Sequence, residues 1–168
     1  VRRITCHLLE QGRTLPGFIG DISYAQSNRE RYEGFCQALA DAGKKVDSSL
    51  CLTTPLGIDT YREEIDTFLS SLSRMPDAFV CASDYVACIL MQLLEKRGLR
   101  VPEDVAVSGF DNNTEDLLAE HLTTVQVFNE ELGARLALQI LYRIKYPNTP
   151  HEITYLGTNV LYRDSTGD

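Results

Sequence analysis

The sequence predicts an α/β fold in which a parallel sheet is flanked by helices, and two observations lead to this class. Four short apolar runs, at residues 15–20, 49–53, 78–82 and 105–110, alternate with segments of about a dozen residues whose apolar side chains recur at helical spacing. The runs also lack the alternation of polar and apolar residues that is typical of a sheet with one face in water. Strands that are apolar on both faces are expected in a sheet buried between two helix layers.

The helical segments carry signals of where they start and end. The first 11 residues form a short stripe that ends before Gly12, which can adopt the left-handed conformation of a helix end. Ser27 stands where the second helix could begin, with Glu30 three residues on as in a capping box, and Gly43 follows the end of this helix. The third helix carries the apolar face Tyr61, Ile65, Phe68 and Leu69, and the fourth is expected over residues 84–97.

After residue 112 the pattern changes. Residues 122–127 are predicted to form a fifth, more polar strand, residues 129–145 a helix, and residues 153–162 an extended segment after a break at 147–150. The apolar stripe of this last helix consists of Leu132, Leu136, Ile140, Leu141 and Ile144. The final segment, residues 163–168, is polar and is expected to be a solvated terminus.

Composition excludes several classes of protein. The 168 residues are 43% hydrophobic and 24% charged, which is typical of one soluble globular domain, or of one domain and a fragment of another. The formal charge of -8 has the wrong sign for contact with phosphates, so this chain is not expected to hold DNA by itself. No apolar run approaches the roughly 18 residues of a membrane span, and the first residues do not resemble a signal peptide. A membrane partner is therefore not expected.

The five cysteines indicate a reducing, cytoplasmic location. Their number is odd, and they stand among apolar neighbours rather than in Cys-x-x-Cys pairs. None of the three histidines supplies a second ligand at short spacing or a partner for a Cys nucleophile. The glycine-rich loops that bind dinucleotides or nucleotide phosphates are also missing from the sequence. We therefore expect no metal and no cofactor.

The candidate ligand site lies at the carboxyl ends of the strands, because the crevice of an open parallel sheet is found there. Asp111 follows the most apolar strand, where its carboxylate could bind a diol or an amine, or could cap the next helix. Arg31, one turn into its helix, could reach the same strand ends, or could pair with Glu30 or Glu33 on the helix surface. Position alone leaves both alternatives open for each residue.

Other side chains at these strand ends have weaker arguments. Asp84 most simply caps the helix that begins there, which leaves Ser83 as the freer candidate for a ligand contact. Tyr24 and Phe110 could stack on a ligand ring, although aromatic residues at strand ends are more often part of the core.

A rival hypothesis is an enzyme on the same sheet. Three carboxylates, those of Asp21, Asp84 and Asp111, could meet across the crevice for acid-base chemistry or to hold Mg²⁺. Against this, the sequence has no nucleophile elbow and no pair of histidines at metal-ligand spacing. Binding rather than catalysis is therefore the favoured interpretation.

Several segments of the chain point to a known family. These segments are residues 18–20, 29–35, 82–84, 98–111, 122–125 and 131–133, in this order. The run Gly-Leu-Arg-Val-Pro-Glu-Asp-Val-Ala-Val-Ser-Gly-Phe-Asp at 98–111 is the most specific of them. Together with the Arg-Asp-Ser-Thr at 163–166, they resemble the effector-binding core of the lac-repressor (LacI/GalR) family of bacterial transcription regulators, whose fold is similar to that of the periplasmic sugar-binding proteins.

The resemblance implies a set of effector-binding residues. Arg31 matches the arginine with which family members grip the effector, and Asp111 matches their effector-binding carboxylate. Ser83 stands where many members have an Asn that reaches the ligand, and Ser27 matches a polar position in the effector loop. With Asp84 and Phe110, which are included for their position at the strand ends, the complete expected set is Arg31, Asp111, Ser83, Ser27, Asp84 and Phe110. The loop 112–121 departs from the family pattern, so no contact is transferred to it.

The resemblance also implies two subdomains. Residues 1–121 and 151–168 are expected to form the carboxy-terminal subdomain, and residues 122–150 a strand and a helix that belong to an incomplete amino-terminal subdomain. The family's DNA-binding headpiece is absent from the matching segments, so operator DNA is an expected partner only through that missing part. Without its usual cover, the apolar stripe of helix 129–145 is expected to fold back, to pair with another chain or to swap between chains.

The implied function is that of an effector-sensing core of a LacI-type transcription regulator. It would bind a sugar or a similar small polar metabolite between two subdomains and thereby change the affinity for operator DNA. The chain would then not be an enzyme, and the intact regulator would be a homodimer. The alternative is a periplasmic sugar-binding protein that serves a transporter, but the odd number of cysteines and the run at 99–105 favour the regulator.

Overall fold

The computed structural model describes residues 1–57, 59–113 and 120–168, and it places the helices and strands in the predicted order. The elements are α1 (Arg2–Glu10), β1 (Pro16–Ile19), α2 (Gln26–Asp41), η1 (Ser48–Leu50), β2 (Cys51–Leu52), α3 (Tyr61–Ser71), β3 (Ala78–Cys81), α4 (Asp84–Lys96), β4 (Ala106–Ser108), β5 (Thr124–Gln126), α5 (Asn129–Lys145), β6 (Asn159–Leu161) and η3 (Asp164–Thr166). The expected α/β class is confirmed, and α5 has the predicted bounds.

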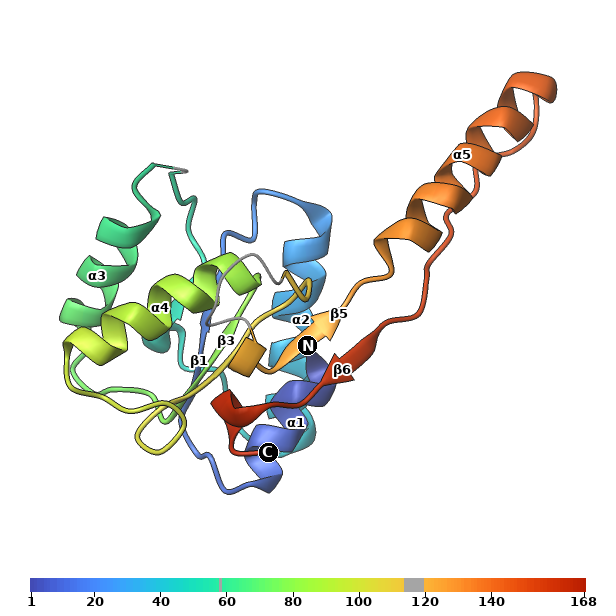
Figure 1. Ribbon diagram of the computed structural model, residues 1–168. Helices are drawn as coiled ribbons and strands as arrows, with labels where there is room; N and C mark the ends of the chain where they lie inside the picture. Colours follow the sequence, from blue (N-terminus) through green and yellow to red (C-terminus); the bar gives the residue numbers. More distant parts are fainter. Residues whose placement is uncertain (58, 114–119) are drawn as a thin grey trace.

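Helices cover both faces of the sheet, with α1 and α2 on one face and α3 and α4 on the other (Figure 1). Adjacent residues of one strand enter different clusters: Phe18 packs with Phe35 of α2, whereas Ile19 belongs to the cluster that contains Leu90 of α4. Side chains alternate across a strand, so a sheet covered on both faces needs apolar residues at every position. This explains why the strands are apolar throughout.

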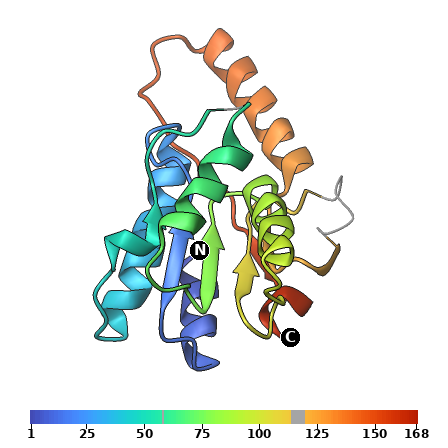
Figure 2. The same ribbon diagram turned by 90° about the vertical axis from the view of Figure 1, so that its left-hand side faces the viewer.

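The main sheet is parallel and has the strand order β2-β1-β3-β4. Phe18 of β1 lies beside Val80 of β3, which lies beside Ser108 of β4, and the three strands run in the same direction in Figure 2. β5 starts alongside the end of β4, where Thr123 bridges to Ser108 in parallel orientation, and then pairs antiparallel with β6. All carboxyl ends of the parallel strands therefore meet at one edge, where ligand sites of such sheets occur.

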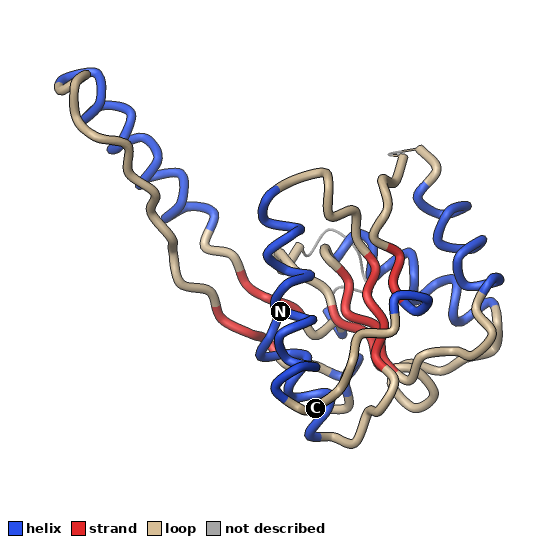
Figure 3. Tube along the Cα trace, turned by 180° about the vertical axis from the view of Figure 1, so that it is seen from behind, coloured by secondary structure: helices blue, strands red, loops and turns tan. Residues whose placement is uncertain are grey.

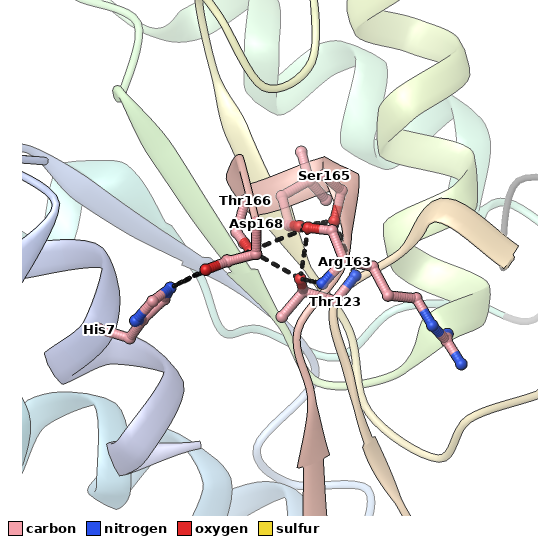
Figure 4. A network of polar contacts seen from close by, with 7 residues as sticks. His7, Thr123, Arg163, Ser165, Thr166 and Asp168 are labelled. Atoms are coloured by element: carbon pink, nitrogen blue, oxygen red, sulfur yellow. Dashed lines mark hydrogen bonds and ion pairs between the residues drawn. The ribbon is translucent and has the colours of Figure 1, made fainter.

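Two residues of the tail after β6, Ser165 and Thr166, are buried, so the prediction of a solvated terminus is wrong for them, while Asp164, Gly167 and Asp168 are exposed. Ser165 is 2% exposed. Its hydroxyl donates to the Val107 carbonyl (2.7 Å) and accepts from the Thr123 N–H (2.8 Å), and Asp168 Oδ2 lies 2.9 Å from His7 Nε2 on α1 (Figure 4). Short polar side chains satisfy backbone groups of β4 and β5 here, a role that the composition of the segment does not reveal.

Residues 127–158, called the arm below, project from the rest of the described chain, called the lobe. β5 leads out to α5 and β6 receives the returning chain (Figure 3). None of the residues of α5 is buried, and Leu136, Leu141 and Ile144 are 57%, 63% and 72% exposed. The helix is therefore not folded back onto the lobe, and pairing with another chain or swapping stays a prediction.

Two further expectations concern the helices and the cysteines. In the part of the chain that the structure describes, no helix has both the length and the apolar character to cross a membrane. All five cysteines are described and are thiols rather than disulfides. Cys81 and Cys88 lie in the apolar core, as expected of small hydrophobic residues.

Candidate functional site

Arg31 lies over the carboxyl ends of the central strands. Its guanidinium, carried by the second turn of α2, donates to the Ala82 carbonyl just after β3 (Nη1 to O, 2.6 Å) and to Asp111 (Nη2 to Oδ1, 3.3 Å). It also stacks on the Phe110 ring, with Cζ 3.7 Å from the ring centroid. The Arg31 side chain is only 17% exposed, so its interpretation as a helix-surface charge paired with a neighbouring Glu is wrong.

The backbone at Asp111 presents its carboxylate to this guanidinium. Asp111 has a φ of 109° and Asn112 a φ of 52°, values in the left-handed region that Asp and Asn tolerate better than most residues. The Asp111 N–H is held by the Val125 carbonyl of β5 (3.0 Å). The Asp111 side chain remains 43% exposed, so it can accept hydrogen bonds from a ligand.

Partial burial changes the protonation equilibria of this pair. Burial lowers the pKa of Arg31, against the opposing effects of Asp111 and Asp84. Burial also raises the pKa of Asp111, and the nearby Arg31 opposes this. Hydrogen bonds made at a partly desolvated pair are stronger than those made in water. The pair therefore offers a donor and an acceptor, side by side, to a polar ligand.

The structure gives the capping role expected of Asp84 to Ser83. Ser83 is the N-cap of α4, and its hydroxyl accepts from the Val86 N–H (3.3 Å). Asp84 is 2% exposed, and its carboxylate accepts from the Thr124 hydroxyl (2.6 Å) and the Asn113 N–H (2.8 Å). The prediction that Asp84 caps the helix is wrong, because the residue before the first helical one has the extended backbone that aims a hydroxyl at the helix end.

Ser27 lies in the first turn of α2 and is exposed. The predicted capping box is wrong, since α2 begins at Gln26 with Ala25 as its N-cap and without a side-chain cap. Glu30 accepts from the Gln26 side chain instead (3.2 Å). Tyr24 is 75% exposed and so is not a core residue, which leaves its ring available to a ligand.

Asp21 does not join the other carboxylates. Its Oδ1 accepts from the Ser23 N–H (2.7 Å) and hydroxyl (2.6 Å), and its Oδ2 from the Leu56 N–H (3.4 Å). Burial favours a raised pKa for Asp21, but these hydrogen bonds outweigh burial, and its pKa is lowered. Within residues 1–57, 59–113 and 120–168, no group of three or more His, Cys, Asp or Glu residues could hold a metal ion. The described carboxylates therefore do not assemble the Mg²⁺ site of the rival hypothesis.

The sequence analysis did not predict three residues that form hydrogen bonds to Arg31, Asp84 and Asn112 at the site. Asn28 Oδ1 accepts from Arg31 (3.4 Å), the Thr124 hydroxyl bonds to Asp84, and Arg163 Nη2 donates to Asn112 Oδ1 (2.9 Å). The sequence shows that Thr124 lies within a short strand and that Arg163 precedes a Ser-Thr pair. Neither pattern indicates that the hydrogen-bond partners are the distant residues Asp84 and Asn112.

A hollow of about 340 Å³ lies elsewhere, between α3 and α4. Its walls include Tyr61 and Tyr85, whose rings meet edge to face at 5.7 Å, and the polar side chains of Arg62 and Gln92. None of the residues that line it belongs to the expected effector-binding set. The candidate site is therefore an open edge of the sheet and not this hollow.

The fold and this group of residues define a class of protein: a ligand-binding α/β lobe with its polar groups at the carboxyl edge of the sheet. The chain belongs to the family of periplasmic binding protein-like domains, whose model matches residues 5–166. Its relatives within that family are transcription regulators, which confirms the predicted LacI/GalR effector-binding core.

Three relatives illustrate the similarity. The regulator DegA of Bacillus subtilis is 35% identical over 130 residues, which cover 76% of this chain and 38% of DegA. The regulator CelR of Thermobifida fusca is 32% identical over 170 residues, which cover 98% of this chain and 48% of CelR. A solved CelR–cellobiose complex has a TM-score of 0.87 and 30% identity, over 98% of this chain and 50% of that one. The chain thus spans half or less of the length of these relatives.

The departure from the family pattern in loop 112–121 lies largely outside the described residues, because residues 114–119 are not described. Its described ends are Asn112 and Asn113 on one side and Glu120 and His121 on the other. Both asparagines take part in the hydrogen bonds around Asp84 and Arg163.

Proposed function

We propose that this chain is the effector-sensing core of a LacI-type transcription regulator and that it binds a small polar metabolite, in the first place a sugar. The observation that carries the proposal is the ion pair of Arg31 and Asp111. It lies at the carboxyl edge of the sheet, rests on Phe110 and is partly open to solvent. Sequence and geometry therefore support the same two residues.

The chemistry of the pair suits a carbohydrate. The carboxylate of Asp111 can accept hydrogen bonds from neighbouring hydroxyl groups, and the guanidinium of Arg31 can donate to a hydroxyl or ring oxygen. Phe110 and the exposed Tyr24 add apolar ring surface for the C–H face of a sugar. The relative CelR has a solved complex with cellobiose, which supports the choice of sugars as the first ligands to test.

The remaining members of the expected set contribute in different ways. Ser27, exposed on the first turn of α2, contacts the ligand directly in this proposal. Ser83 contributes from the N-cap of α4, where its hydroxyl is already bonded to a backbone N–H. Asp84 acts from beneath the site, because its carboxylate is buried against Thr124.

The proposed mechanism is a shift between two arrangements of subdomains. Residues 1–121 and 151–168 form one subdomain and residues 122–150 contribute to the other, so a ligand held by Arg31 and Asp111 favours closure between them. Operator DNA is bound by a headpiece outside this chain, in a homodimeric regulator located in the cytoplasm. The ligand changes the affinity for DNA only by its differential affinity for the two arrangements. Neither step is catalytic, and the relatives that support the proposal are regulators rather than enzymes.

These relatives also favour a regulator over a sugar-binding protein of a transporter. DegA and CelR are both transcription regulators, and their similarity covers 76% and 98% of this chain. The five thiols agree with a reducing compartment.

Calorimetry against a panel of sugars and nucleobases tests the proposal, on this chain and on a regulator of its relatives' length. We expect Arg31→Ala and Asp111→Ala each to weaken binding of a sugar by roughly 10- to 100-fold, since a hydrogen bond to a charged group contributes about 1.5–3 kcal/mol. Arg29→Ala is the matched control, because Arg29 is an exposed residue of the same helix. Unchanged affinity in both site variants would refute the assignment.

A further inference from the structure

The loop that presents Asp111 is held from the side by the strands that lead to the arm. The Gly109 N–H donates to the Thr123 carbonyl (2.8 Å), and the Asp111 N–H donates to the Val125 carbonyl (3.0 Å). Val125 belongs to β5 and Thr123 directly precedes it, so the backbone of the loop is bonded to the chain at β5 as well as to β4. The backbone that carries the Asp111 carboxylate is thus bonded directly to β5.

Thr124 joins this loop to the buried carboxylate of Asp84. Its hydroxyl donates to Asp84 Oδ1 (2.6 Å) and accepts from the Asn112 N–H (3.3 Å), while Asp84 Oδ2 accepts from the Asn113 N–H (2.8 Å). Both Thr124 and Asp84 are almost fully buried, so these bonds are shielded from water. A side chain at Gly109 would collide with Asp84 Oδ1, which shows how closely the carboxylate is packed under the loop.

Arg163, two residues after β6, holds the same loop from the other strand. Its Nη2 donates to Asn112 Oδ1 (2.9 Å), and its Nη1 donates to the Leu122 carbonyl ahead of β5 (3.0 Å). Its backbone N–H donates to the Thr123 hydroxyl (2.7 Å). Arg163 thus connects the chain that follows β6 to the residues just before β5 and to Asn112, the residue that follows Asp111.

The left-handed backbone of Asp111 and Asn112 requires such support. A non-glycine residue at positive φ is strained, and it persists only where the surrounding contacts hold it. Bonds from Thr124 and Arg163 both reach Asn112, the second of these two residues. The support is supplied by β5 and by the chain after β6, and not by the sheet alone.

We infer that Thr124 and Arg163 are positioning residues that hold the effector-binding carboxylate of Asp111 and tie it to the strand pair β5–β6. This inference rests on the proposed function. Because β5 and β6 are the two connections between the lobe and the arm, the strand pair moves with whatever α5 contacts. Effector contact at Asp111 and the position of the arm are therefore coupled, and the coupling is reciprocal.

Hydrogen exchange without ligand tests the positioning. We expect Thr124→Val, which keeps the shape but removes the hydroxyl, to speed amide exchange at Gly109, Asp111 and Asn112 by roughly tenfold, since local opening needs fewer bonds to break. Thr124→Ser keeps the hydroxyl and stays near the wild-type rates. Amides of β1 and β3 keep their protection in both variants, which separates a local effect from general loss of stability.

Arg163→Gln tests the positioning role independently. Because Arg163 is only half-buried, this variant remains informative even if Thr124→Val, at a fully buried position, fails to fold. The same loop amides exchange faster in Arg163→Gln, while Arg163→Lys, which retains the positive charge, recovers part of the protection. Arg135→Gln on the exposed surface of α5 is the matched control and changes nothing at the loop. Wild-type exchange at Gly109 and Asp111 in both Thr124→Val and Arg163→Gln overturns the inference.

Binding of cellobiose then tests the coupling. In the wild type, saturating cellobiose is expected to slow exchange at the β6 amides of Val160 and Leu161. Arg163→Gln binds it roughly tenfold more weakly and, even at saturation, no longer protects β6. Persistent protection of β6 in Arg163→Gln contradicts the coupling. If the wild type binds none of the sugars and none of the nucleobases, the proposed function fails, while the ligand-free exchange still decides whether Thr124 and Arg163 position the loop.

Discussion

The lobe and the arm contain similar apolar helices, but only the lobe buries them. Leu90 and Leu94 of α4 are fully buried between the helix layer and the sheet. In α5, by contrast, every residue is at least partly exposed, and Leu138 is 62% exposed. The surroundings differ, because α4 packs against α3, β3 and β4, whereas none of the residues of α5 is buried. An apolar stripe therefore predicts that a helix needs cover, but not which element supplies it.

The two helices also begin differently. α4 starts with Ser83, whose hydroxyl caps the first turn, whereas α5 starts after Phe128 without a side-chain cap. A capped helix that packs on a sheet is stable for two independent reasons. α5 has no side-chain cap and does not pack on a sheet, so its stability depends on a contact with another element or chain.

Truncation of a large apolar side chain should give the largest difference between the lobe and the arm in the change of the free energy of unfolding. Phe79→Ala removes a fully buried ring that packs edge to face against Phe68, and should lower the free energy of unfolding by about 3–5 kcal/mol. Leu136→Ala on the exposed face of α5 should change it by less than about 0.5 kcal/mol. Chemical denaturation measures both values.

Sedimentation at several protein concentrations tests whether α5 pairs with another chain. If α5 pairs with another chain, Leu136 is buried in the assembly, and Leu136→Ala then weakens association. A strict monomer with α5 exposed contradicts the prediction of pairing or swapping.

The same change from Gly to Ala should have opposite effects in the two regions. A Cβ at Gly109 collides with Asp84 Oδ1 and comes within 2.9 Å of Leu122 Cδ2, so Gly109→Ala should destabilise the lobe by about 1–3 kcal/mol. A Cβ at Gly133 in α5 meets open space, so Gly133→Ala should favour the helix by roughly 0.5–1 kcal/mol. Thermal unfolding measures the effect of Gly109→Ala, and the helix content from circular dichroism measures the effect of Gly133→Ala. A gain of stability from Gly109→Ala would contradict the close packing around Gly109.

Loss of the Ser83 cap should have a smaller effect. Ser83→Ala leaves the Val86 N–H without its side-chain acceptor and should cost about 1 kcal/mol of stability. Ser83→Asp retains an acceptor at the N-cap and is the matched control, with a stability near that of the wild type. Equal losses in both variants would show that the hydroxyl is needed for something other than the cap.

The smallest expected effect is a change of pH dependence. Burial raises the pKa of Asp84, so the folded chain binds this proton more tightly than the unfolded chain does. The resulting stability is present below about pH 4, the ordinary range of an Asp, and is lost as the pH rises through the raised pKa. The wild type should therefore become less stable relative to Asp84→Asn between pH 4 and pH 7, as measured by denaturation at several pH values.

Asp47 provides a control of opposite sign. Hydrogen bonds from the Ser49 hydroxyl and N–H lower the pKa of Asp47. Its contribution is present above about pH 4 and is lost as the pH falls through the lowered pKa. The wild type should thus lose stability relative to Asp47→Asn on the acid side, and parallel trends in the two variants would contradict these assignments.

Most of the fold could be predicted from the chain. The strands were found because burial on both faces leaves a continuous apolar run, and α5 was predicted with its observed bounds because its stripe is long. Position near the strand ends made Arg31 and Asp111 candidates, the resemblance selected them, and the structure brings them together. The cap of α4 was assigned one residue too late, since adjacent Ser and Asp are both good caps and only the backbone angle separates them.

The sequence by itself determined the class of fold and the order of the elements, because these depend on local periodicity, and its resemblance to the LacI/GalR family selected Arg31 and Asp111 from the candidates near the strand ends. Tertiary structure alone decided that Asp84 is turned inward to Thr124, that Ser165 is buried and that Arg163 reaches Asn112. Each of these contacts joins residues about 40 or more positions apart, at a distance where no periodicity connects the partners. Such long-range hydrogen bonds are chosen by packing, and the one from Arg163 reaches the loop that contains Asp111 and Asn112.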